Sequence, residues 1–153
     1  MENLRELAWF DPPTNVDESD IRDIESQLGI RFPEDYRHFL ATSGGGSPIE
    51  SDFLIAETRG PFNASVGVFF DVISDEYGIS STLESLQSRK IEGLVPIAES
   101  GGGDFVCFDY RQGTPPSLVY WHHGRRGLND EVVFISRTFA AFLELLYEPV
   151  DEE

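Results

Sequence analysis

The chain has 153 residues, 40% hydrophobic and 12% aromatic, which suffices for one globular core and is too apolar for a disordered chain. It carries 28 Asp and Glu against 11 Lys and Arg, a formal net charge of −17 at pH 7. Nucleic-acid phosphates and anionic membranes repel such a polyanion, whereas basic proteins attract it. We therefore expect no nucleic-acid and no membrane partner, although acidity can also serve solubility alone.

The sequence suggests a reducing compartment. Its single cysteine, Cys107, cannot form an internal disulfide and lies in an apolar run where a buried, inert thiol is expected. The N-terminus lacks the basic and apolar pattern of a signal peptide, and no apolar run approaches the roughly 18 residues of a membrane span. We expect a cytoplasmic protein.

The first ten residues are predicted to form a short helical lead-in, which Pro12 and Pro13 end because proline removes a backbone donor. The next helix has Asp17 or Ser19 as its N-cap, with acids in its first turn. Gly29 stands where the helix should end. Its apolar residues recur at spacings of three and four, as on one helix face: Ile21, Ile24 and Leu28.

A second helix is predicted to begin at Pro33, with Glu34 and Asp35 beside the positive end of its dipole. The glycine-rich run 43–48 ends it, so the two helices form a hairpin. The apolar stripe of the second helix consists of Tyr36, Phe39 and Leu40.

Residues 49–79 are harder to interpret, but aromatic and β-branched runs predict strands at 53–55 and 66–72. A middle helix from Ser80 or Ser81 to about Lys90 follows. Four further strands are predicted at a spacing near ten residues, which favours an antiparallel meander. They span 94–98, 104–109, 117–122 and 131–135, and a last helix spans 137–147.

These elements predict an α+β fold, in which an antiparallel mixed sheet carries an N-terminal helical hairpin, one middle helix and a C-terminal helix packed on it. We expect one domain over residues 1–153, with 1–16 as a lead-in and 148–153 as an acidic tail.

No motif specifies a catalytic, metal or cofactor site. The glycine runs 44–46 and 101–103 lack the lysine and the following helix of a phosphate loop, so they predict turns with positive φ. His122 and His123 are adjacent and would point to opposite faces of a strand, which prevents them from sharing a metal. We predict no enzyme activity and no cofactor. A small-molecule or nucleotide-binding enzyme that uses the turn Gly102-Gly103-Asp104 and His122 is the weaker alternative.

The candidate partner-binding surface is the acidic stretch 49–88, which holds seven acids against Arg59 alone, together with the aromatic residues Phe62 and Tyr77. An acidic surface with aromatic anchors suits a basic protein partner, while a merely solvated face is the alternative. The basic turn 122–127 is predicted to pair with nearby carboxylates. The predicted contact residues are Glu50, Asp52, Glu57, Asp71, Asp75 and Glu76.

Two runs of residues resemble the signature of the SUKH superfamily. The first, 21–46, contains Leu28-Gly29, then Pro33-Glu34-Asp35-Tyr36 and a glycine run, with Ser43 where the family commonly has Asn. The second consists of 95–98, Gly102-Gly103-Asp104 and 107–109. The likeness extends over about 17–147. Because these motifs end one helix, begin the next and turn a strand, we expect them to be structural.

The resemblance implies an immunity protein that binds and neutralises a cognate bacterial polymorphic toxin, many of which are nucleases. The family also includes fungal cell-wall assembly regulators, so a regulatory protein–protein interaction module is the alternative. The resemblance and the net charge together lead us to expect a basic toxin as the partner. We expect this chain to be a monomer or a weak dimer.

Overall fold

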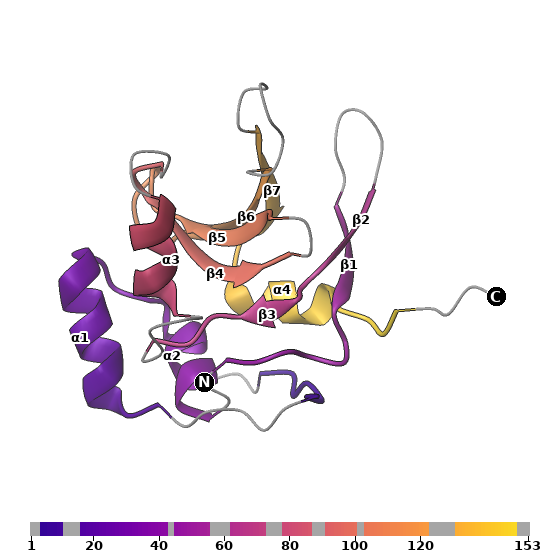
Figure 1. The fold of residues 1–153 in the computed structure, drawn as a ribbon, viewed down its shortest axis with the longest axis horizontal. Coiled ribbons are helices and arrows are strands. Elements are labelled where there is room, and N and C mark those ends of the chain that lie inside the picture. Colours follow the sequence, from indigo (N-terminus) through magenta and orange to yellow (C-terminus); the bar gives the residue numbers. More distant parts are fainter. Residues whose placement is uncertain are drawn as a thin grey trace.

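A computed structural model describes residues 4–10, 16–42, 45–55, 62–72, 78–86, 91–100, 103–122 and 131–149. Within these ranges, four helices and two antiparallel sheets confirm the predicted α+β class (Figure 1). The helices are α1 (Glu18–Leu28), α2 (Glu34–Thr42), α3 (Ile79–Leu86) and α4 (Phe139–Leu145). The strands are β1 (Asp52–Ile55), β2 (Phe62–Ser65), β3 (Val68–Phe69), β4 (Leu94–Glu99), β5 (Phe105–Asp109), β6 (Ser117–His122) and β7 (Glu131–Ser136).

The larger sheet has the order β3-β4-β5-β6-β7, with every pair antiparallel, so the predicted meander is confirmed. Its central strand is buried on both faces: Phe108 faces the helices and Cys107 points to the other side, and neither is exposed to solvent. A strand buried on both faces reads as an unbroken apolar run, which is how 105–108 reads in the sequence.

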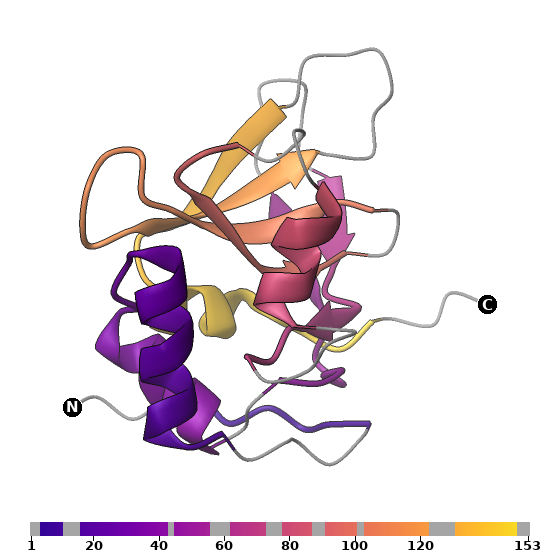
Figure 2. The same ribbon diagram turned by 60° about the vertical axis from the view of Figure 1, so that its left-hand side comes forward.

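The helices cover the sheet from different positions (Figures 1 and 2). The α4 helix packs against β6 and β7, and α2 packs on α4, whereas α3 contacts β4. The ring of Tyr36 joins these layers, with its centroid 4.9 Å from that of Phe108 and 4.9 Å from that of Phe139. The helical hairpin therefore contacts the sheet through α2, and α1 packs against α2. None of the described helices is long and apolar enough to cross a bilayer.

The predicted ends of α1 are also confirmed. Asp17 is the N-cap, and its backbone N–H donates to the carboxylate of Asp20 at 3.1 Å. Gly29 adopts a φ of 69°, and its N–H donates to the carbonyl of Ser26. This left-handed conformation is the reason that a glycine ends the helix.

The second sheet consists of β1 and β2 and packs on the same core. Phe53 of β1 lies 5.2 Å from Phe142 and 6.1 Å from Tyr120, measured between ring centroids. Beyond α4, the chain pairs with β1: the N–H of Asp52 donates to the carbonyl of Tyr147 at 3.0 Å, and the reverse bond is 2.8 Å. The β1–β2 hairpin is therefore bonded to the segment that follows α4.

The predicted helical lead-in is wrong over the described residues 4–10. This segment is extended, and Trp9 forms a β-bridge with Pro48. The N–H of Phe10 donates to the carbonyl of Ser47 at 3.0 Å, and that of Ile49 donates to Ala8 at 2.8 Å. Pairing with a distant segment satisfies these backbone groups in place of the helical bonds that the local sequence allowed.

The predicted strand 66–72 is shorter in the structure, where only the two residues of β3, Val68 and Phe69, form a strand. At Val66 the N–H still donates to Ser51, but that of Gly67 donates to Glu99, so the chain changes sheets there. Opposite β3, a bulge in β4 follows Pro96, which has no N–H to donate.

The middle helix begins at Ile79, ahead of the predicted Ser80 or Ser81, because the hydroxyl of Ser81 bonds both backbone groups of Gly78. Its predicted extension over 87–90 lies outside the described residues.

Candidate functional site

Two acids of the first motif, Glu25 and Asp35, hold elements of the fold together. Glu25 is only 9% exposed, and its Oε2 accepts the N–H of Phe32 at 2.7 Å. The guanidinium of Arg37 lies 3.3 Å from the same carboxylate. A buried acceptor with both a backbone and an ionic partner fixes the connection between α1 and α2.

Asp35 links the same hairpin to the end of the chain. Its Oδ1 accepts the N–H of Tyr36 at 2.8 Å, and its Oδ2 accepts that of Ala140 at 2.9 Å. The second bond places a carboxylate at the first turn of α4, where unpaired N–H groups and the positive end of the helix dipole favour it.

The second motif contains a similar arrangement. Asp109 accepts hydrogen bonds from the backbone N–H of Arg111 at 2.9 Å and from its Nε at 3.0 Å. Burial alone would raise the pKa of Asp109, but these bonds and the arginine charge outweigh burial and lower the pKa below 3.8. The carboxylate is thereby committed to the turn after β5.

Four polar side chains form a cluster around the turn at Asp104, at one end of the sheet. The hydroxyl of Tyr120 lies 3.0 Å from both Asp104 Oδ2 and Ser100 Oγ, and His122 Nδ1 lies 3.8 Å from the same Oδ2. The structure thus brings together the Asp104 and His122 of the enzyme alternative. His122 is only 2% exposed, however, so its imidazole is closed to a substrate here.

The other chemically active groups are also enclosed. Burial, with the nearby charge of Asp109, raises the pKa of the Cys107 thiol. Among the described residues, no three His, Cys, Asp or Glu side chains are grouped to hold a metal. His123 and most of the basic turn 122–127 lie outside the described residues.

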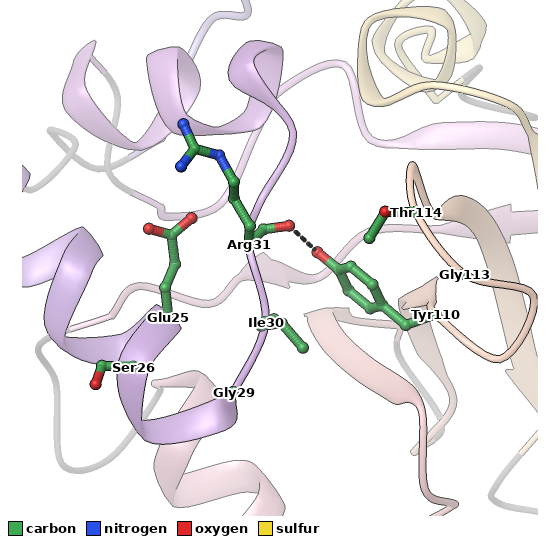
Figure 3. Close-up of a pocket in the computed structure, with 8 residues that line it drawn as sticks. All are labelled: Glu25, Ser26, Gly29, Ile30, Arg31, Tyr110, Gly113 and Thr114. Carbon is green, nitrogen blue, oxygen red and sulfur yellow. Dashed lines mark hydrogen bonds between the residues drawn. The ribbon is translucent and has the colours of Figure 1, made fainter.

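A groove of about 610 Å³ runs where the two motifs meet (Figure 3). The Tyr110 hydroxyl crosses it and donates to the carbonyl of Arg31 at 2.8 Å. The charged ends of Glu25 and Arg31 point away from Tyr110 in Figure 3, so charged groups do not converge on the groove. Its lining residues are Glu25, Ser26, Gly29, Ile30, Arg31, Tyr110, Gly113 and Thr114.

The arginines indicate where a charged partner can approach. Arg22 and Arg31 pair with glutamates of the helical hairpin, at 3.5 and 3.4 Å, and Arg5 bonds carbonyls at the end of α4. With Arg37 and Arg111, five of the six arginines in the described ranges, all but Arg137, therefore bind other groups of the chain. Four of these five pair with carboxylates, and Arg5 instead donates to backbone carbonyls.

The structure describes three of the six predicted contact acids, and they have different surroundings. Glu50 Oε1 accepts the N–H of Ala8 at 2.8 Å and so supports the extended N-terminal segment. Asp52 lies in β1, whereas Asp71 follows β3, and its carbonyl accepts the N–H of Ile79 at the start of α3. Glu57, Asp75, Glu76 and Tyr77 lie outside the described residues, as does the side chain of Phe62. Their part in binding stays a prediction.

The outer face of the β1–β2 hairpin gathers exposed residues that the sequence did not connect. Leu54 pairs with Asn63 across the strands, and Asp52 pairs with Tyr147 on the other side of β1. Leu54 is 59% exposed and Tyr147 is 40% exposed. We call Asp52, Leu54, Asn63 and Tyr147 the hairpin face. Tyr147 and Asn63 are 84 positions apart, and no local pattern signals their contact.

Comparison with known proteins identifies the family. The model of the SMI1 / KNR4 family (SUKH-1) matches residues 15–145. The chain belongs to this family. The resemblance seen in its two motifs is therefore confirmed, and in this SUKH-1 chain those motifs are the parts that tie α1, α2, α4 and β5 together. A relative in Bacillus subtilis (strain 168), the "SPbeta prophage-derived uncharacterized protein YokK", is 22% identical over 160 residues, which cover 93% of this chain and 80% of that protein.

Proposed function

We propose that this SUKH-1 protein is an immunity protein, which binds and neutralises a cognate bacterial toxin in the cytoplasm, and that the toxin is a basic nuclease. The proposal includes action by binding alone, without a reaction or a cofactor. Family membership supports it, because the SUKH superfamily consists mainly of such immunity proteins.

The observation that carries the proposal is the net charge of −17, together with the ion pairs that Arg22, Arg31, Arg37 and Arg111 form with carboxylates within the part of the chain that the structure describes. A nuclease must attract nucleic-acid phosphates, so it presents a positive surface. Opposite charges raise association rates toward about 10⁸–10⁹ M⁻¹s⁻¹ at low salt, which suits an inhibitor of a lethal enzyme.

The test begins with the genes that flank this one. Each flanking reading frame that encodes a toxin-like domain is expressed in a laboratory strain, with and without this chain. We expect the toxin to stop growth alone and to be tolerated in the presence of the chain. Association of the purified pair should slow steeply between low and high salt. The proposal fails if this chain protects cells from none of the flanking products.

A regulatory interaction module is the second candidate, because the matching family is named for SMI1 and KNR4 and the superfamily includes fungal regulators. Affinity purification of the tagged full chain from its native host separates the two candidates. A housekeeping protein as the specific partner supports regulation, and a toxin domain supports immunity.

A further inference from the structure

The hairpin face combines exposed apolar area with geometry that is already fixed. Tyr147 leaves the backbone beside Asp52, and its hydroxyl donates to Oδ1 of Asn63, the residue opposite Leu54. The tyrosine ring therefore extends along the face from Asp52 toward Leu54. Figure 1 shows the chain that leaves α4 passing β1, in agreement with the two backbone hydrogen bonds between Asp52 and Tyr147.

A chain of hydrogen bonds holds these surface side chains. Tyr147 donates to Asn63 Oδ1, and Asn63 Nδ2 donates to Asp52 Oδ2 at 3.0 Å. Exposed side chains ordinarily lose rotamer freedom when a partner binds, and this loss opposes binding. Here much of that ordering is already present in the free protein, which is a property of binding surfaces.

The exposed groups match one cationic side chain particularly well. Among the described residues, the contact of Asp52 Oδ1 is a long one, 3.4 Å, to the hydroxyl of Ser51, so the carboxylate can accept further bonds. An arginine can bond this carboxylate with its planar guanidinium, stack on the ring of Tyr147 and lay its aliphatic stem on Leu54. Lysine lacks the planar group and stacks less well.

We infer that the hairpin face docks an arginine-bearing segment of a basic protein, with Tyr147 and Leu54 as the apolar anchors and Asp52 as the anion. The identity of that protein as the toxin rests on the proposed function. The surrounding charge agrees with this occupant, because Glu50 and Glu148 flank the face in sequence, and Arg5 is bound to carbonyls of α4.

Deca-arginine is the first probe, titrated into the full-length isotope-labelled protein at 150 mM NaCl, with deca-lysine in parallel. We expect the amide shifts to concentrate at residues 52–54, 63–65 and 147, and deca-arginine to bind more tightly. Tyr147→Ala should weaken deca-arginine binding about three- to fivefold, in line with the loss of an exposed cation–π contact, and Leu54→Ala, which removes the apolar surface under the arginine stem, should weaken it by about the same factor. Phe134→Ala is the matched control, since Phe134 is 57% exposed on β7, and should leave binding unchanged.

Shifts spread evenly over all exposed acids, or equal weakening by Phe134→Ala, would overturn the inference. Far-ultraviolet circular dichroism of each variant shows whether it is folded, and Tyr147→Phe, which keeps the ring, should retain most of the affinity. The toxin is the second probe. A toxin bound as tightly by Leu54→Ala and Tyr147→Ala as by the natural chain contradicts the docking surface and leaves the immunity function standing. If the chain protects cells from none of the flanking toxins, the proposed immunity function is contradicted. The amide shifts with deca-arginine still show in that case whether the hairpin face binds arginine.

Discussion

Individual carboxylates in this protein have two different fates. Glu25, Asp35 and Asp109 accept hydrogen bonds from backbone N–H groups inside the fold, so their charge is used there. Asp52 keeps acceptor capacity toward solvent. Acidity alone therefore does not identify a binding residue. A carboxylate can bind a partner only with oxygens that the fold has not already used as hydrogen-bond acceptors.

The pKa of Asp109 should depend on Arg111. In the natural chain the arginine lowers the pKa of Asp109. In Arg111→Gln burial and the backbone N–H bond of residue 111 remain but the guanidinium is lost, so the pKa should rise. An acid with a lowered pKa adds stability above its unfolded pKa, near 4, and loses that contribution as pH falls through its folded pKa. The stability difference between the two proteins should thus be present at pH 7 and shrink below about pH 4.

Carbon-13 NMR titration of the Asp109 carboxyl measures the pKa, and urea unfolding at pH 7 and pH 3 measures the difference. Arg22→Gln removes an exposed pair with Glu18 and should cost less than about 1 kcal/mol at either pH. A pKa for Asp109 that Arg111→Gln leaves unchanged would contradict this prediction.

The candidate site shows what residue patterns can and cannot predict. The acidic stretch predicts Asp52 as a contact residue, but the sequence pattern predicts Leu54 only as part of a strand and Tyr147 only as the end of a helix. Their proximity depends on the pairing of Asp52 with Tyr147, which are far apart in sequence. Glu50 was named for its charge, and only the structure shows that it accepts a bond from Ala8.

At the scale of elements, local signals predicted those parts whose bonds are local. The helical hairpin follows from its apolar spacing, from Gly29 and from Pro33, and the meander strands follow from short apolar runs between turns. The helix predicted for the N-terminal segment is wrong because the backbone partners of this segment, residues 47–49, lie about forty positions away in the sequence. The separation of β1 and β2 into their own sheet depends likewise on where Val66 and Gly67 change partners.

The bond from Ala140 to Asp35 should be important for docking α4 on the helical hairpin. Asp35→Ala removes this acceptor from the positive end of α4, and we expect a loss of about 1–2 kcal/mol in the free energy of unfolding. Hydrogen exchange of the Ala140 amide should accelerate in the variant. Glu34→Ala, at the exposed neighbouring position, should change stability by less than about 0.5 kcal/mol. Unchanged exchange at Ala140 in Asp35→Ala would show that the bond does not hold the helix.

At the scale of the whole molecule, the net charge has two opposed consequences. Mutual repulsion of surplus carboxylates keeps the protein soluble and draws basic partners, but it also destabilises the compact state. The arginines offset the acids mainly where elements join, as Arg37 does between α1 and α2. In the part of the chain that the structure describes, exposed acids outside these ion pairs include Glu84, Glu92 and Glu148.

Salt should therefore stabilise this protein. The Debye length falls from about 30 Å at 0.01 M salt to about 8 Å at 0.15 M, so screening weakens repulsion across the molecule. The exposed ion pairs that salt also weakens contribute little, under about 1 kcal/mol each, so the repulsive effect should dominate. We expect the thermal unfolding midpoint to rise steadily from 10 to 300 mM NaCl. A triple variant with glutamine at Glu84, Glu92 and Glu148 should unfold at a higher temperature in low salt and gain less from added salt. A midpoint that stays flat or falls would mean that the surplus carboxylates do not repel one another enough to affect the fold, and that ion pairs within the chain outweigh them.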